Sequence, residues 1–251
     1  MTDESKDNPN AIVFDCVYKS FDGNKVLRGV SFEVPKGEAL CILGRSGTGK
    51  SVTLKLMIGL LKPDQGKVLV AGEDVGALDE DGLSRIRRKM GFLFQSAALF
   101  DSFSLNDNLA VPLHRLEPGK SKQQIAEAVD RILDQVGLKQ DKNKMPVALS
   151  GGMRKRAGLA RALVLQREIL LVDEPSSGLD PLTAAEIDDL LLKVKNESHT
   201  TLVVVTHDIR GARRVGDKFA VLDQGKLAGF GTADELEKSE NKLVREFLSG
   251  S

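Results

Sequence analysis

The sequence predicts an α/β protein with a mixed sheet core, an antiparallel β subdomain and an inserted helical subdomain. Short, continuous apolar runs at residues 39–43, 168–173 and 201–206 are typical of parallel strands buried on both faces. Amphipathic stretches of helical period alternate with these runs, as they do around a parallel sheet. Between about residues 96 and 165 the strand signal disappears, which indicates the helical insertion.

The first hundred residues are expected to supply the antiparallel strands and the first buried strand. Two runs alternate in polarity with period two, as partly exposed antiparallel strands do. A continuous apolar run then ends in glycine and is followed by a helical pattern. The expected elements are strands at residues 12–14, 30–34, 39–43, 67–70 and 90–94 and a helix at 49–60.

The helical subdomain is expected at residues 96–165, and the sheet is expected to resume after it. Helical patterns occupy residues 121–136 and 151–165, and the segments that join them contain prolines, which disfavour helix interiors. After the insertion we expect strands at 168–173, 201–206, 219–222 and 227–230, a helix at 182–195 and two short helices at the end.

Composition and charge limit the function classes. The chain has 251 residues, 41% apolar and 29% charged, as an ordinary globular domain has. Its 36 basic and 36 acidic residues cancel, which argues against a nucleic-acid partner. A polar N-terminus at residues 1–10 is expected to be flexible and to precede one domain at 11–251. Without a signal peptide or a membrane-spanning run, we expect a cytoplasmic protein that reaches a membrane only through a partner.

A phosphate-binding loop follows the first buried strand. Residues 44–51 match the pattern G-x-x-x-x-G-K-[ST] throughout. Glycines at three positions let the backbone N–H groups converge on phosphates, the lysine supplies a cation, and the final hydroxyl is a ligand for Mg²⁺. The expected ATP-binding residues are Gly44, Arg45, Ser46, Gly47, Thr48, Gly49, Lys50 and Ser51.

Three further side chains are expected to complete the catalytic site with Lys50. Asp173 ends an apolar strand and is placed to hold Mg²⁺, and Glu174 follows it as the general base or water-orienting group. His207 follows another apolar strand, which we expect beside the strand before the phosphate-binding loop. Its imidazole would then reach the γ-phosphate of the bound nucleotide.

A second phosphate-binding surface is expected at the start of a later helix. Ser150, Gly151 and Gly152 open this helix and offer bare backbone N–H groups to an anion. This surface lies about a hundred residues after the first one, so the sequence predicts two separate surfaces that contact phosphates.

Together these motifs closely resemble the nucleotide-binding domain of ABC ATPases, and the resemblance covers nearly the whole chain. It implies a P-loop NTPase fold of ABC type, with residues 149–153 as the signature segment and Met153 where glutamine is commoner. It also implies that Gln95 contacts Mg²⁺ and senses a permease, that Asp180 belongs to the D-loop, and that Tyr18 stacks on adenine. The signature surface would serve ATP held by a second copy, in a head-to-tail dimer that drives transport.

A narrower resemblance concerns residues 92–103 and 106–113, which look like the ATPases of MCE-type lipid transport systems such as Mla. It implies a phospholipid transporter on the inner membrane, with an integral permease and an MCE-type substrate-binding protein on separate chains. A STAS-like accessory subunit is a further candidate partner. The expected permease-docking patch consists of Ala98, Leu99, Phe100 and Phe103.

Alternatives remain open at this point. The apolar residues of that patch could instead pack within the helical subdomain. Another cargo, such as an amino acid, a metal chelate or a lipoprotein, would need the same nucleotide motifs. A soluble ABC protein acting on ribosomes or DNA is disfavoured, because the chain has a single phosphate-binding loop and no basic excess.

Overall fold

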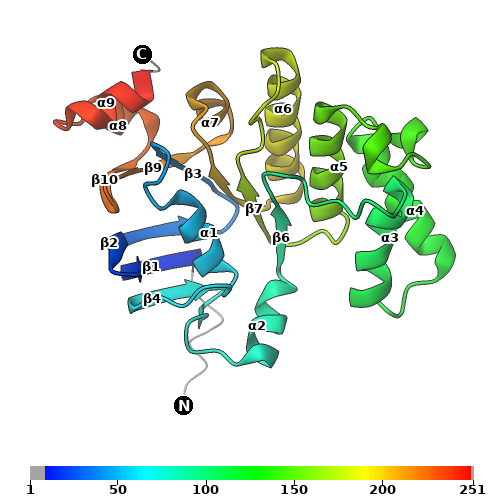
Figure 1. Cartoon of the computed structure of the whole chain (residues 1–251), viewed down its shortest axis with the longest axis horizontal. Coiled ribbons are helices and arrows are strands. Elements are labelled where there is room, and N and C mark those ends of the chain that lie inside the picture. The colour runs from blue at the N-terminus through cyan, green and yellow to red at the C-terminus, as the bar shows by residue number, and fades with distance from the viewer. Residues whose placement is uncertain (1–8, 250–251) are drawn as a thin grey trace.

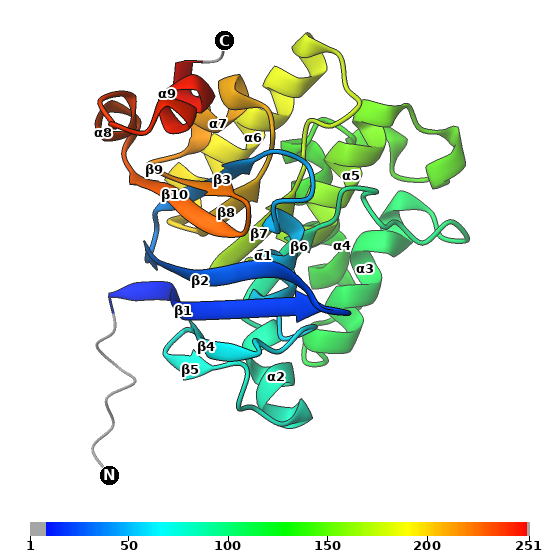
Figure 2. The same cartoon turned by 60° about the vertical axis from the view of Figure 1, so that its left-hand side comes forward.

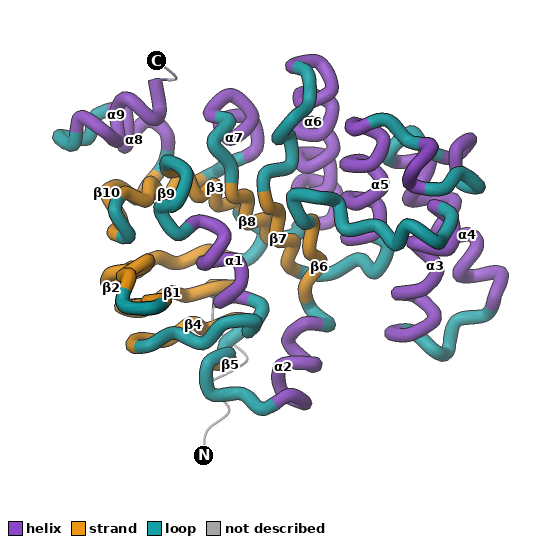
Figure 3. Tube along the Cα trace, viewed as in Figure 1, coloured by secondary structure: helices purple, strands orange, loops and turns teal. Residues whose placement is uncertain are grey.

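Two β-sheets and a lateral block of helices make up the computed structural model, which describes residues 9–249 (Figure 1). Strands occupy the centre and one side, and the helices α3, α4 and α5 lie together on the other side (Figure 3). The expected flexible N-terminus at residues 1–10 falls mostly outside the described residues, and Asn10 already begins the first strand. Among the described residues, no helix has the length and apolar character that crossing a membrane requires.

The central sheet has six strands in the order β10-β9-β3-β8-β7-β6. All neighbours pair in parallel except β9 and β10, which form an antiparallel hairpin. Every residue of β3 and β8 is buried, which explains their unbroken apolar runs. The strands are β3 (Ala39–Gly44), β6 (Met90–Leu93), β7 (Ile169–Asp173), β8 (Thr201–Val205), β9 (Lys218–Asp223) and β10 (Lys226–Gly231).

The second sheet is antiparallel, in the order β2-β1-β4-β5, and lies beside the central sheet (Figure 2). Its first two strands are much longer than the patterns predicted. A register shift between Phe14 and Val17, with Cys16 at φ 47°, reverses the alternation of buried and exposed residues within β1. The period-two signal therefore breaks there. The strands are β1 (Asn10–Phe21), β2 (Asn24–Pro35), β4 (Gln65–Val70) and β5 (Glu73–Asp74).

The helical block contains one helix that the sequence did not predict. Helix α3 (Leu105–Leu116) has Pro112 in its interior, where a proline disfavours helix formation. Ser104 caps the helix by accepting a hydrogen bond from the backbone N–H of Asp107. Leu109 and other apolar residues at helical spacing are buried in the core of the block. This burial outweighs the one backbone hydrogen bond that the proline removes.

The other helices of the block agree with their patterns. Helix α4 (Lys122–Gln135) begins with a capping box formed by Ser121 and Gln124, as a Ser-x-x-Gln sequence should. Helix α5 (Gly151–Leu163) starts at the signature segment. The remaining helices are α1 (Lys50–Met57), α2 (Glu80–Arg87), α6 (Pro181–Ser198), α7 (Ile209–Val215), α8 (Ala233–Glu237) and α9 (Lys242–Ser249). Neither α2 nor α7 is among the elements expected above.

Candidate nucleotide-binding site

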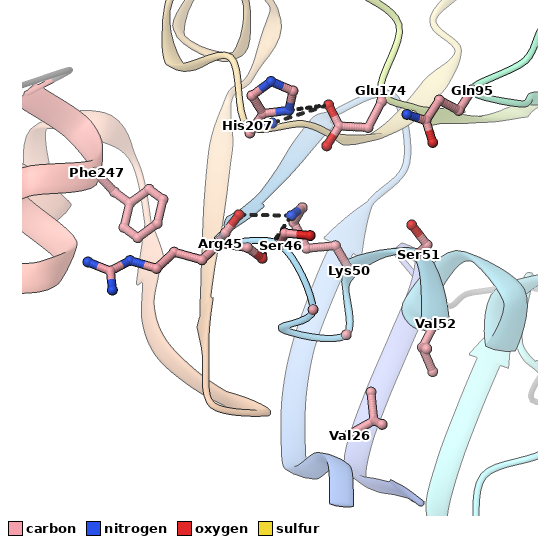
Figure 4. Close-up of a pocket in the computed structure, with 13 residues that line it drawn as sticks. Val26, Arg45, Ser46, Lys50, Ser51, Val52, Gln95, Glu174, His207 and Phe247 are labelled. Carbon is pink, nitrogen blue, oxygen red and sulfur yellow. Dashed lines mark hydrogen bonds and ion pairs between the residues drawn. The ribbon is translucent and has the colours of Figure 1, made fainter. Parts of the chain in front are cut away.

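The predicted catalytic residues meet at the carboxyl edge of the central sheet. The strands β3, β7 and β8 are parallel neighbours, so the residues that follow them emerge at the same edge. They surround an open cavity of about 690 Å³ (Figure 4). The predicted residues that line it are Gly44, Arg45, Ser46, Gly47, Gly49, Lys50, Ser51, Gln95, Glu174 and His207. Thr48 instead braces the loop, because its hydroxyl donates to the Arg45 carbonyl at 2.9 Å.

Two glycines make the loop possible. A Cβ on Gly44 would lie 2.5 Å from the carbonyl oxygen of Leu222, on the neighbouring strand β9. Gly49 has φ 99° and precedes α1 directly, and a Cβ there would lie 2.8 Å from the Leu27 side chain. A side chain at either position would therefore push the loop away from the sheet or strain its backbone.

Lys50 is the first residue of α1, at the end of this loop, and is largely buried. Its ammonium donates hydrogen bonds to the carbonyl oxygens of Gly44 at 2.8 Å and Arg45 at 3.1 Å. Burial lowers the pKa of Lys50, and the nearby carboxylates of Glu174 and Asp173 act in the opposite direction. The ammonium thus lies between the loop backbone and the acidic strand end, where it can meet a phosphate.

Oxygen donors suited to Mg²⁺ lie together beside Lys50. The hydroxyl of Ser51 is 3.3 Å from a carboxylate oxygen of Asp173, and the Gln95 amide lies across the cavity. Burial raises the pKa of Asp173, and a divalent cation would favour its ionised form. Hydroxyl, carboxylate and amide oxygens are hard ligands of the kind that Mg²⁺ takes when phosphates supply the rest. The residues present therefore fit the predicted ion.

Glu174 and His207 face the phosphate-binding loop from the opposite wall. A carboxylate oxygen of Glu174 is 2.7 Å from the Nδ1 atom of His207, and the histidine is much the more exposed of the two. Glu174 has φ 48°, in the left-handed region that residues other than glycine rarely adopt. Its backbone N–H donates to the carbonyl of Val205 at 2.8 Å, which anchors this conformation to β8. Contacts between neighbouring strands therefore determine the backbone conformation of Glu174 and its position beside His207.

The signature segment lies on a different part of the molecule. Ser150 is the N-cap of α5, and its hydroxyl accepts the backbone N–H of Met153 at 3.2 Å. The described residues that line the cavity include neither Ser150 nor Gly151 nor Gly152. A Cβ on Gly152 would lie 2.5 Å from the Thr183 side chain, so this glycine serves close packing against α6. One chain alone does not bring the two phosphate-binding surfaces together.

Two other predicted nucleotide contacts also lie outside the cavity. Asp180 caps α6, where it accepts backbone N–H groups of Leu182 and Thr183, each at 3.1 Å. Tyr18 lies within β1, which extends well beyond the strand expected at residues 12–14, and its ring is partly exposed beside Gly29 of β2. Their contacts with nucleotide remain predictions.

Four residues of the site were missed by the sequence reasoning. Val26, Val52 and Phe247 line the cavity, and Phe247 reaches it from the last helix, α9. Lys155 lies behind the cavity, with its ammonium on the carbonyl oxygen of Glu174. None belongs to a phosphate-binding pattern, and for Lys155 the signal in the sequence was the basic triplet at residues 154–156.

The proposed docking patch divides into exposed and packed residues. Phe100 and Phe103 are 49% and 40% exposed, with ring centroids 5.6 Å apart. Ala98 and Phe100 line a separate groove of about 480 Å³ between β6, α3 and α5, with Phe94 and Leu116. Leu99 instead packs against the core of the helical block, as the alternative interpretation expected.

Comparisons with known proteins agree with this geometry. The family model described as ABC transporter matches residues 27–177. The probable ribonucleotide transport ATP-binding protein mkl of Mycobacterium leprae is 44% identical over 92% of this chain and 67% of its own length. Protein TRIGALACTOSYLDIACYLGLYCEROL 3, chloroplastic, of Arabidopsis thaliana is 39% identical over 98% of this chain and 76% of its own. This chain thus spans about two thirds of the length of the mycobacterial relative.

Two more comparisons concern cargo and structure. The methionine import ATP-binding protein MetN of Rhizobium meliloti is 40% identical over 96% of this chain and 69% of its own length. A dimeric structure of the ATP-binding cassette MJ0796, in a post-hydrolysis state bound to ADP and Pi, superposes with a TM-score of 0.82 at 33% identity. This superposition covers 88% of the present chain and 98% of the MJ0796 chain. The chain therefore belongs to the ABC transporter ATP-binding family and is an ABC-type ATPase that binds ATP.

Proposed function

We propose that this chain hydrolyses ATP to drive a phospholipid transporter of MCE type. In this function Glu174 takes the proton of the attacking water, or orients it, and His207 holds the carboxylate through Nδ1. The observation that carries the catalytic part is the 2.7 Å contact between these two side chains, opposite the buried Lys50.

The electrostatic part of catalysis falls to the phosphate-binding loop. Its backbone N–H groups and the Lys50 ammonium neutralise charge on the β- and γ-phosphates. Ser51, Asp173 and Gln95 would hold Mg²⁺, which when bound polarises the phosphate oxygens. In the nucleotide complex the Lys50 ammonium would donate to phosphate oxygens in place of the carbonyl oxygens of Gly44 and Arg45 that it now contacts.

The complete site requires a second copy of the chain. Ser150, Gly151 and Gly152 do not line the cavity beside the phosphate-binding loop of their own chain, so we infer a head-to-tail pair that sandwiches two ATP molecules. In this arrangement Asp180 and Tyr18 would contribute at the edges of the nucleotide. ATP favours the closed pair more than ADP does, so hydrolysis shifts the population toward the open one.

An integral permease is the proposed membrane partner, which would place the chain on the inner face of the inner membrane. The groove beside Phe94 and Phe100 offers an apolar surface with Arg115 and Arg161 among its lining residues. An apolar helix of the permease with an acidic residue fits this surface. An MCE-type substrate-binding protein, with or without a STAS-like subunit, would complete the assembly.

The proposal of lipid as the cargo rests on the plant relative and on the segment at residues 92–113. The plant relative carries the name of a galactolipid, matches 98% of this chain, and therefore includes residues 92–113. The methionine import relative, at 40% identity, favours an amino acid as the second candidate cargo. The mycobacterial relative's name adds ribonucleotides as a third.

The cargo can be tested by isolating the complex from native membranes. The tagged chain is extracted in mild detergent, and the proteins and lipids that co-purify are identified by mass spectrometry. We expect a permease, an MCE-type protein and a defined phospholipid in amounts above those of bulk membrane. Recovery with a receptor for an amino acid or a nucleotide, and lipid in bulk proportions, would contradict the lipid function.

A further inference from the structure

Lys155 connects three functional segments through one buried ammonium group. It lies one turn into α5, the helix that begins at the signature segment, and is only 7% exposed. Its Nζ donates hydrogen bonds to the carbonyl oxygen of Gln95 at 2.6 Å and to that of Glu174 at 2.9 Å. Gln95 follows β6 and Glu174 follows β7, so the contacts join residues that are 60 and 19 positions away in the sequence.

This burial is unfavourable by itself and has to be offset by local interactions. Burial lowers the pKa of Lys155, while the nearby carboxylates of Glu174 and Asp173 favour the charged form. Buried charges persist where hydrogen bonds and opposite charges compensate them. The two carbonyls and two carboxylates meet that condition, so the ammonium is held in one position.

The carbonyl of Glu174 belongs to an unusual piece of backbone. Glu174 has φ 48°, and its backbone N–H donates a hydrogen bond to the carbonyl oxygen of Val205 on β8. The backbone carbonyl of Glu174 accepts a hydrogen bond from Nζ of Lys155 on α5, and its carboxylate contacts Nδ1 of His207. A conformation of this kind persists only where the surroundings determine it from several sides. Lys155 supplies the hydrogen bond that reaches this backbone from the helical block.

We propose that Lys155 is a positioning residue for hydrolysis, which fixes the backbone of Glu174 and links it to Gln95 and to the signature helix. A movement of the Gln95 segment or of α5 would then shift the catalytic carboxylate directly. The inference rests on the proposed role of Glu174 as the group that activates water, and it is independent of the cargo.

The test is replacement of Lys155 by methionine in the full chain, because methionine keeps an unbranched stem and has no donor. A small displacement of a catalytic group lowers turnover steeply, so we expect kcat to fall about 10–100-fold. The KM for ATP and the melting temperature should stay at wild-type values. Lys142→Met is the matched control. It removes a 2.9 Å ion pair with Asp130 in the same helical block, far from the cavity, and should leave kcat unchanged.

Measuring Lys155→Met together with Glu174→Gln distinguishes a positioning role of Lys155 from a general structural effect of its replacement. When Glu174→Gln is already present, Lys155→Met should slow hydrolysis no further, since the group that it positions has been disabled. An equal loss in both backgrounds, or wild-type kcat in folded Lys155→Met, would overturn the inference. A wild-type rate in Glu174→Gln alone would instead overturn the proposed role of Glu174.

Lys155→Gln keeps the test decisive if the methionine variant does not fold. Its amide group can donate to one of the two carbonyls but is too short to bridge both. A reduced kcat that is lost in the Glu174→Gln background supports positioning. Wild-type turnover in the folded glutamine variant overturns it.

Discussion

The imidazole of His207 and the carboxylate of Glu174 are joined across two neighbouring strands, with Nδ1 of the histidine 2.7 Å from an oxygen of the glutamate. The histidine is 67% exposed and the glutamate 13%, so the pair extends from the sheet edge into the cavity. This contact orients a carboxylate toward the phosphate-binding loop while its backbone is anchored from β8 and α5. The geometry is that of a base held in place by an orienting group.

Replacement of Glu174 by glutamine should stop turnover but keep ATP binding. The amide cannot accept a proton from water, so we expect kcat to fall by about 10²–10⁴. Lys50 and the loop backbone are untouched, so ATP affinity should remain, and the ATP-bound pair of chains should accumulate. Steady-state hydrolysis, equilibrium ATP binding and light scattering measure these three results. Glu168→Gln, on an exposed carboxylate just before β7, is the control and should behave as wild type.

Two inactive variants should restore activity when they are mixed. Lys50→Ala removes the phosphate cation, and Gly151→Asp places a negative charge on the signature surface, where a Cβ meets only an ordinary 3.8 Å contact. In a mixed pair, one site combines both defects and the other combines an intact loop with an intact signature. Each variant alone should be inactive, and the mixture should regain part of the wild-type rate. If the mixture stays inactive while mixed pairs form, the composite site is wrong.

A charge at Phe100 should separate the chain from its permease. Phe100→Glu would place a carboxylate in the groove between β6, α3 and α5, at a side chain that is half exposed in the free chain. Buried aromatic residues at interfaces commonly contribute about 2 kcal/mol or more, so recovery with the membrane complex should be lost. ATP affinity of the isolated chain should not change. Val147→Glu, at an 88% exposed position, is the control that should still be recovered with membranes.

Asp188 should make stability depend on pH in an unusual direction. Burial, with repulsion from Asp208 and Asp189 and partial compensation by Arg214, raises its pKa from 3.8 to about 6. A carboxyl group with a raised pKa in the folded state is favourable when protonated, so stability is lost as the pH rises from about 4 through about 6.

Asp188→Asn imitates the protonated form and should therefore be more stable than wild type at pH 7.5. From the pKa difference we expect a gain of up to about 3 kcal/mol that disappears below pH 4. Urea unfolding at a series of pH values measures it. Asp189→Asn, at the exposed neighbouring carboxylate, should change stability by at most about 1 kcal/mol. Equal stabilities of wild type and Asp188→Asn at pH 7.5 would contradict the prediction.

Most of the central sheet could be predicted because each strand has a local signature. The runs that became β3 and β8 are wholly buried, and β7 and β9 each contain four consecutive buried residues, as continuous apolar sequences predict. The second half of β1 was missed because the bulge at Cys16 shifts its alternation by one residue. Helix α3 was missed because Pro112 has a strong local cost, which long-range burial in the helical block outweighs.

By itself the sequence determined the chemistry of the phosphate-binding loop and of the signature segment, because their backbone donors are contiguous in the chain. It also identified Asp173, Glu174 and His207 as residues at strand ends. Only the tertiary structure decided that Glu174 contacts His207, that Lys155 is buried against both Gln95 and Glu174, and that Leu99 packs inward while Phe100 does not. These contacts depend on the order of strands and on the docking of α5, which bring together residues that no local pattern relates.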